Sequence, residues 1–155
     1  MKTLKLAVTK TEYENSINTA AEILKNGGVV GMPTETVYGL AASAYNDEAI
    51  KKVFAAKGRP QDNPLIVHIS NMDMLYEVAK DIPEKALLCA EKFWPGPLTM
   101  VLPKTEKTAK SVSAGLDTVA VRMPSHKVAL DIIETAKLPL AAPSANTSGS
   151  PSPTA

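Results

Sequence analysis

The two arginines of this sequence stand apart from its other basic residues. Of the 17 basic residues, 15 are lysines, and only Arg59 and Arg122 are arginines. Each arginine lies near a proline, in the segments "KGRPQDNP" (57–64) and "VAVRMP" (119–124). The planar guanidinium holds a carboxylate or a phosphate through two parallel hydrogen bonds, whereas lysine acts as a point charge. This distribution favours anion recognition at the two positions over a role in solubility.

Polar loops beside predicted strands hold further side chains that could bind an anion. They are "PTETVYG" (33–39), "KGRPQDNP" (57–64) and "APSANTSGSPSPT" (142–154), and His68 lies at the exit of the strand that follows the second loop. Their prolines restrict the backbone, and α/β proteins build ligand sites in loops at strand ends. Each residue also has a structural interpretation, because Thr36, Ser144 and Asn146 suit turns and His68 suits a protein core.

The composition and the missing motifs exclude several classes of protein. A chain of 155 residues with 45% hydrophobic residues suits one soluble domain, and a net charge of +1 is too small for a dedicated nucleic-acid binder. The sequence has no P-loop, dinucleotide fingerprint, nucleophile elbow, CxxC or HExxH motif. It also has no signal peptide and no apolar stretch long enough to span a membrane, so we expect a cytoplasmic protein.

Hydrophobic periodicity and turn signals predict alternating helices and strands. Helices are expected from Thr11 to Gly27, from Asn46 or Asp47 to Lys57, from Ser70 to about Lys80, over 84–93, and from Ser125 to about Lys137. Strands are expected over 29–32, 65–69, 98–102, 118–123 and 138–142. This order predicts an α/β domain with a mixed sheet. The residues alone therefore indicate an α/β domain with a polyanion or carboxylate pocket.

Five segments, in this order, resemble the signatures of the YrdC/Sua5 family. They are "GGVVGMPTETVYGL", "KGRPQDNPLIVHI", "FWPGPLTMVL", "VAVRMP" and "APSANTSGSPSPT", and the likeness covers about residues 12–155. The resemblance implies an open, twisted mixed sheet with flanking helices and a concave basic cavity. Members of the family continue past the point where this chain stops. We therefore expect residues 1–155 to be a single YrdC-like domain without its C-terminal portion.

The resemblance also implies an enzyme, an L-threonylcarbamoyladenylate synthase of the nucleotidyltransferase class. Such an enzyme makes threonylcarbamoyl-AMP and pyrophosphate from L-threonine, bicarbonate and ATP. Mg²⁺ would accompany the ATP, and no metal held tightly by the protein is expected. Its product supplies the threonylcarbamoyl-transfer machinery that modifies position 37 of tRNA, and weak RNA binding is a further expectation. No covalent nucleophile is needed, because the step depends mostly on positioning and charge neutralisation.

Family roles carried over to matching positions give a predicted site. The threonine pocket would contain Thr36, His68, Arg122 and Ala142, with Arg122 suited to the carboxylate. ATP would be bound by Arg59, Asn63, Thr118, Ser144 and Ser152. The family's KxR…SxN combination gives the catalytic set, which is Lys57, Arg59, Ser144 and Asn146. No metal ligand is expected among these residues.

Two alternatives remain open from the sequence. One is a domain that forms carbamoyl-adenylate from carbamoyl phosphate, because such domains share the KxR…SxN combination. "PTETVYG" together with His68 and Arg122 favours threonine over this alternative. The other is a non-catalytic RNA-binding module. The small net charge and an aromatic content of 5% count against RNA binding as the main role. The sequence does not determine the oligomeric state, or whether a further domain follows.

Overall fold

The computed structural model of the protein describes residues 12–33, 38–57 and 64–143. Within these ranges the strands form one six-stranded sheet in the order β1-β2-β6-β3-β5-β4. The strands are β1 (Val30–Pro33), β2 (Tyr38–Ser43), β3 (Ile66–His68), β4 (Met100–Pro103), β5 (Thr118–Arg122) and β6 (Leu140–Ala142). Only β3 and β5 pair in parallel, and the other neighbouring strands are antiparallel. The prediction of a mixed α/β sheet is confirmed.

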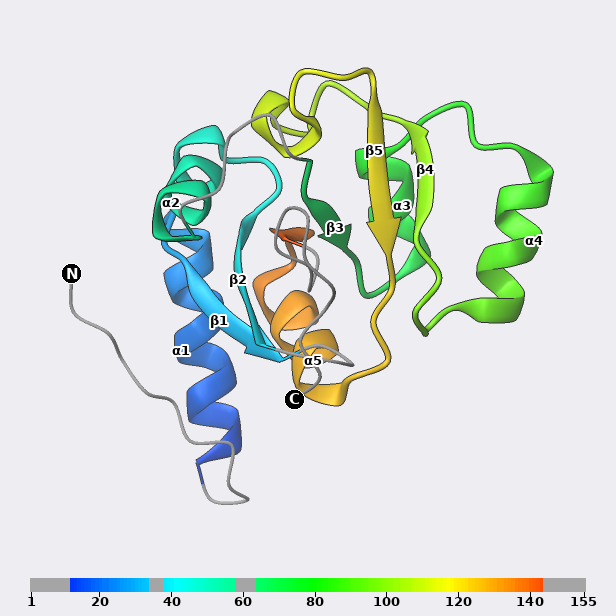
Figure 1. Ribbon diagram of the computed structural model, residues 1–155. Coiled ribbons are helices and arrows are strands. Elements are labelled where there is room, and N and C mark those ends of the chain that lie inside the picture. The colour runs from blue at the N-terminus through cyan, green and yellow to red at the C-terminus, as the bar shows by residue number, and fades with distance from the viewer. Residues whose placement is uncertain (1–11, 34–37, 58–63, 144–155) are drawn as a thin grey trace.

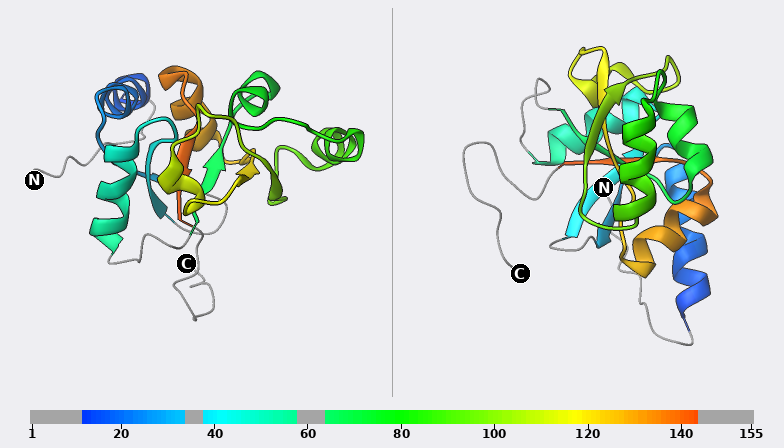
Figure 2. Two further views of the ribbon diagram at one scale, coloured as in Figure 1. Left: turned by 90° about the horizontal axis from the view of Figure 1, so that it is seen from above. Right: turned by 90° about the vertical axis from the view of Figure 1, so that its right-hand side faces the viewer.

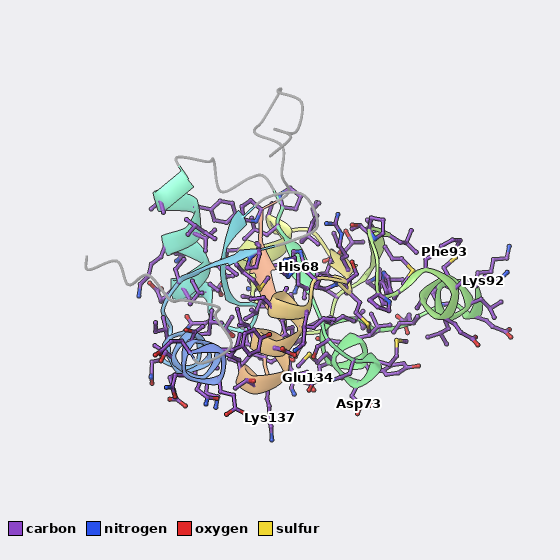
Figure 3. The ribbon with its side chains drawn as sticks, turned by 90° about the horizontal axis from the view of Figure 1, so that it is seen from below. His68, Asp73, Lys92, Phe93, Glu134 and Lys137 are labelled. Carbon is purple, nitrogen blue, oxygen red and sulfur yellow. The ribbon has the colours of Figure 1, made fainter. Side chains whose placement is uncertain are left out.

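The helices cover mainly one face of this sheet. They are α1 (Tyr13–Lys25), α2 (Asp47–Lys57), α3 (Met72–Val78), α4 (Glu84–Phe93) and α5 (Lys127–Ala136), with a short 3-10 helix η1 (Lys110–Ser113). Seen from above, α1, α5 and α3 form a row on one side of the sheet, while α4 projects beyond β4 (Figures 1 and 2). Ser70 and Asn71 donate hydrogen bonds of 2.8 and 3.0 Å to the Glu134 carboxylate, which ties the start of α3 to α5 (Figure 3).

The two faces of the sheet differ along β3, β5 and β4. Val67, Val121, Val119 and Leu102 alternate onto one face, and all four are buried. On the opposite face Ile66 and Ala120 are half-buried, Thr118 is exposed, and Val101 is 66% exposed. The first face is therefore core, and the second face is more open to solvent.

The sequence did not predict β2. Its residues, "YGLAAS", include glycine and alanines, which have low strand propensity, and the polar loop predicted over 33–39 overlaps only its first two residues. In the fold β2 pairs with β1 on one side and with β6 on the other. Backbone pairing with two neighbours thus outweighs the weak local preference, and Ala41 and Ala42 are fully buried.

Several predicted helix ends are shifted by one or two residues. The third helix is capped by Asn71, whose side chain accepts from the Met74 amide at 2.9 Å, and not by Ser70. The fifth helix is capped by His126, whose Nδ1 accepts from the Val128 amide at 3.2 Å, and not by Ser125. In both cases a neighbouring side chain makes the same hydrogen bond to the helix amides. Thr11, the predicted cap of the first helix, lies outside the described residues.

Asp47 connects the first turn of α2 with Ser111 of η1. Its Oδ1 accepts hydrogen bonds from the Ser111 amide at 3.0 Å and from the Ser111 hydroxyl at 2.5 Å. The bond from the Ser111 hydroxyl is the main reason why the pKa of Asp47 lies below its usual value. Because the charged form is favoured in the folded state, this contact stabilises the protein above the unfolded pKa of about 4.

We expect Asp47→Ala to lower the free energy of unfolding by about 1 kcal/mol at neutral pH. The difference from the wild type should shrink as the pH falls through the folded-state pKa of Asp47. Chemical denaturation at a series of pH values measures it. Glu48→Ala is the matched control, because the Glu48 side chain is 83% exposed and forms a surface ion pair with Lys51 across 3.7 Å. A difference that is equally large at pH 3 and pH 7 would contradict this account of Asp47.

Candidate functional site

His68 and Arg122 end two neighbouring parallel strands. His68 is the last residue of β3, Arg122 is the last residue of β5, and the two are paired in the register of the sheet. Paired residues of adjacent strands project to the same face, so both side chains start from the more open face. Ligands of α/β proteins commonly bind at the carboxyl ends of parallel strands. The fold thus brings together two of the four residues predicted for the threonine pocket.

Arg122 is a half-buried cation that is held by a neutral partner. Its Nε donates a hydrogen bond of 3.0 Å to the Thr99 hydroxyl oxygen. The ion pairs among the described residues join other groups, so no described carboxylate lies within salt-bridge distance of Arg122. A partly desolvated guanidinium is unfavourable unless a negative group compensates it. This environment suits a site for an anionic ligand.

His68 is buried, with only 2% of its surface exposed. Its Nδ1 lies 3.2 Å from the carbonyl oxygen of Ile66. Because a carbonyl can only accept, Nδ1 carries the proton in this hydrogen bond. Figure 3 shows His68 near the centre of the molecule, between the helical layer and the open side. Burial and the backbone bond fit a core histidine, whereas the place beside Arg122 fits a ligand site.

Thr118, on β5, and Ala142, on β6, lie beside the start of β3. Ala142 is buried and pairs with Ile66, which in turn pairs with Ala120 of β5. Thr118, two residues before Ala120, is exposed at the start of β5. Two residues of strand separate Ile66 from His68, about 7 Å. The predicted threonine residues are therefore spread over both ends of β3, with Thr118 at the Ala142 end.

The remaining predicted residues are not placed by the structure. Thr36, Arg59, Asn63, Ser144, Asn146 and Ser152 lie outside the described residues, and Lys57 is described only as the last residue of α2. Most of the predicted catalytic set is among them, so its roles stay predictions. The concave basic cavity also stays a prediction. The segment 58–63 nevertheless has fixed ends, because it connects α2 with Pro64 and Leu65, whose amide donates to the Val112 carbonyl at 2.8 Å.

Thr99 is a site residue that sequence reasoning missed. It lies directly before β4, and because Met100 pairs with Val121, it stands opposite Arg122. The signal was present in "FWPGPLTMVL", where a hydroxyl residue follows a rigid turn and precedes a strand. A threonine at such a place has several local uses, however, so only the register of β4 and β5 identifies its partner.

Neither a metal-binding cluster nor a membrane-spanning helix is present among the described residues. The parts of the chain that are described contain no group of three or more His, Cys, Asp or Glu side chains able to hold a metal ion. Among the helices described above, none has the length and apolar character needed to cross a membrane.

Comparisons with known proteins identify the family to which this chain is similar. The model of the Sua5_yciO_yrdC family, described as "Telomere recombination", matches residues 22–155. The chain is 53% identical over 152 residues to a threonylcarbamoyl-AMP synthase of Pyrococcus abyssi, covering 98% of this chain and 45% of that protein. It is 54% identical over 136 residues to the protein of that name from Bacillus subtilis, covering 87% of this chain and 39% of that protein. The chain thus spans less than half the length of these relatives.

A solved structure shares the fold closely. The crystal structure of P. abyssi Sua5 complexed with L-threonine superposes with a TM-score of 0.85 at 56% sequence identity. The superposition covers 90% of this chain and 41% of that one. The open mixed sheet with its flanking helices is therefore the fold of that family.

Proposed function

Because this chain belongs to the Sua5_yciO_yrdC family, we propose that the protein containing it makes threonylcarbamoyl-AMP and pyrophosphate from L-threonine, bicarbonate and ATP. Two relatives carry the name threonylcarbamoyl-AMP synthase, and one related structure is a complex with L-threonine. The observation that carries the proposal is Arg122, a half-buried guanidinium beside His68 without a described acidic partner. An amino acid brings the carboxylate that such a site needs.

The proposed reaction depends mainly on positioning of the substrates and on neutralisation of their negative charge. The threonine amine attacks the bicarbonate carbon, and loss of water leaves a carbamate. A carbamate oxygen then attacks the α-phosphate of ATP as pyrophosphate leaves. In this scheme Arg122 binds the threonine carboxylate, and His68 borders the same pocket with Thr36 and Ala142. Holding the substrate in this way turns a collision of separate molecules into a reaction of bound groups. This role requires no covalent intermediate on the protein.

The ATP side of the site is proposed from sequence positions. Arg59, Asn63, Thr118, Ser144 and Ser152 would bind ATP, which enters with Mg²⁺ as part of the substrate. Lys57 would add positive charge near the phosphates, and Asn146 would complete the catalytic set. Of this group, Thr118 has a described side chain, which is exposed at the open face. Positive groups around the phosphates would stabilise the charge that moves onto the leaving pyrophosphate.

Further parts of the proposal concern the cellular role. The enzyme would belong to the nucleotidyltransferases, work in the cytoplasm and supply the machinery that transfers the threonylcarbamoyl group to tRNA. Weak RNA binding by the protein itself is part of the same expectation.

Pyrophosphate release from ATP tests the proposal. The protein that contains this chain should release pyrophosphate only when L-threonine and bicarbonate are both present. Omission of either one should reduce the rate to background. Release that needs carbamoyl phosphate in place of threonine and bicarbonate would instead support the carbamoyl-adenylate alternative. Salt-sensitive RNA binding without any nucleotide-dependent reaction would support an RNA-binding module.

A further inference from the structure

The hydrogen bond to Thr99 restricts how Arg122 can form a bidentate contact with a ligand. A guanidinium offers two forks to a carboxylate, one formed by Nε with a terminal nitrogen and one formed by the two terminal nitrogens. The hydrogen bond of 3.0 Å from Nε to the Thr99 hydroxyl occupies the first fork. The two terminal nitrogens then remain for a bidentate contact.

The position of Thr99 is itself fixed by the turn before β4. The Trp94 indole donates a hydrogen bond of 2.8 Å to the Leu98 carbonyl, next to Thr99. The Gly96 amide donates a bond of 2.8 Å to the carbonyl of Met123, next to Arg122. Trp94 is only 8% exposed, so this turn is anchored in the core. The turn therefore connects the residue before β4 with the end of β5.

Glycine is required within this turn. A Cβ atom added to Gly96 would lie 2.5 Å from the Phe93 carbonyl oxygen, and real Cβ atoms do not approach backbone oxygens so closely. The sequence "WPGP" thus allows the chain to turn tightly and to place Thr99 opposite Arg122. The turn therefore holds Thr99 rigidly, and Thr99 in turn positions the Arg122 side chain.

We propose that Thr99 is a positioning residue, which turns the Arg122 guanidinium so that its two terminal nitrogens receive the ligand's carboxylate end-on. This inference rests on the proposed function and adds a residue and a binding geometry to it. Thr99 does not touch the substrate in this scheme. It acts by restricting Arg122 before the ligand arrives, which lowers the entropy lost on binding.

The test compares two substitutions that differ by the hydroxyl group. Thr99→Val keeps the size of the side chain and removes the acceptor, whereas Thr99→Ser keeps the acceptor. We expect Thr99→Val to raise KM for L-threonine about tenfold, because the loss of a hydrogen bond to a charged group has an effect of this size. KM for ATP should change less than about twofold. Thr99→Ser should stay within about twofold of the wild type for both substrates. Thr99→Ala replaces Thr99→Val if the latter does not fold.

Thr108→Val is the control for the effect that loss of a threonine hydroxyl has on stability alone. Thr108 is 1% exposed, and its hydroxyl donates to the Val78 carbonyl at 3.0 Å, away from Arg122 in the fold. Thr108→Val should lower the melting temperature and leave KM for L-threonine unchanged. Equal behaviour of Thr99→Val and Thr99→Ser, or an equal rise of both KM values in Thr99→Val, would overturn the positioning role. A wild-type protein whose turnover ignores L-threonine would overturn the proposed function itself.

Discussion

Arg122→Ala should weaken L-threonine binding by about 10- to 100-fold. The expected loss corresponds to the removal of two hydrogen bonds from a charged donor to a carboxylate. The guanidinium is half-buried at the end of β5 beside His68, and no described carboxylate compensates its charge. The ligand would therefore supply the missing negative group. Isothermal titration calorimetry with L-threonine measures the effect directly.

Two further variants show whether the effect depends on the guanidinium or on positive charge alone. Arg122→Lys keeps the charge but lacks the planar fork, so its affinity should fall between those of the wild type and the alanine variant. Lys51→Ala removes one positive charge from the exposed surface of α2, where Lys51 pairs with Glu48, and should bind threonine normally. ATP affinity should be largely kept in all three variants. Unchanged threonine affinity in Arg122→Ala would show that the carboxylate lies elsewhere.

Arg59→Ala should lower ATP-dependent turnover by about 100-fold, because a charge-stabilising donor at a reacting phosphate has an effect of this size. Arg59 lies outside the described residues, and its expected role follows from the sequence "KGRPQDNP" and from the described residues on either side of that segment. The described residues on either side of this segment are Lys57, the last residue of α2, and Pro64, which shortly precedes β3. Ala142 pairs with the first residue of β3, and Thr118 lies nearby at the start of β5. Arginine there suits a phosphate through two parallel bonds.

The matched control for Arg59 is Lys52. Lys52 lies on an exposed part of α2, where its Nζ is 3.2 Å from the Gly27 carbonyl oxygen. Lys52→Ala changes the net charge by the same amount as Arg59→Ala and should leave turnover unchanged. Steady-state pyrophosphate release at saturating L-threonine distinguishes the two variants. A wild-type rate in Arg59→Ala would remove Arg59 from the proposed ATP site.

Local sequence signals were sufficient for most elements of the fold. Periodic apolar residues and turn residues located five helices and five of the six described strands within a few residues. The first helix, for example, ends as expected before Gly27, whose φ of 83° is a backbone conformation that suits glycine. β2 was missed because its glycine and alanines give little local preference for a strand. Its pairing with β1 and β6 is a property of the whole sheet.

Candidate site residues could be assigned to strands from the sequence, but their relative positions could not. Arg122 and His68 could each be placed on a strand, yet their side-by-side position depends on parallel pairing between segments about 50 residues apart in the chain. Such nonlocal pairing leaves no signal in a short window of sequence. The partnership of Thr99 with Arg122 was hidden for the same reason. It follows from the register of β4 on β5, which the sequence pattern alone does not fix.

The most direct test of the proposed synthase identifies its product. The protein that contains this chain would be incubated with ATP, Mg²⁺, L-threonine and ¹³C-labelled bicarbonate, and the nucleotides would be analysed by mass spectrometry. We predict an adenylate, the mixed anhydride of AMP with a carbamate, that contains one threonine and one ¹³C carbonyl. It should form in equal amount with pyrophosphate and be absent without threonine. Pyrophosphate without a threonine-containing adenylate, or an adenylate free of the ¹³C label, would contradict the proposal.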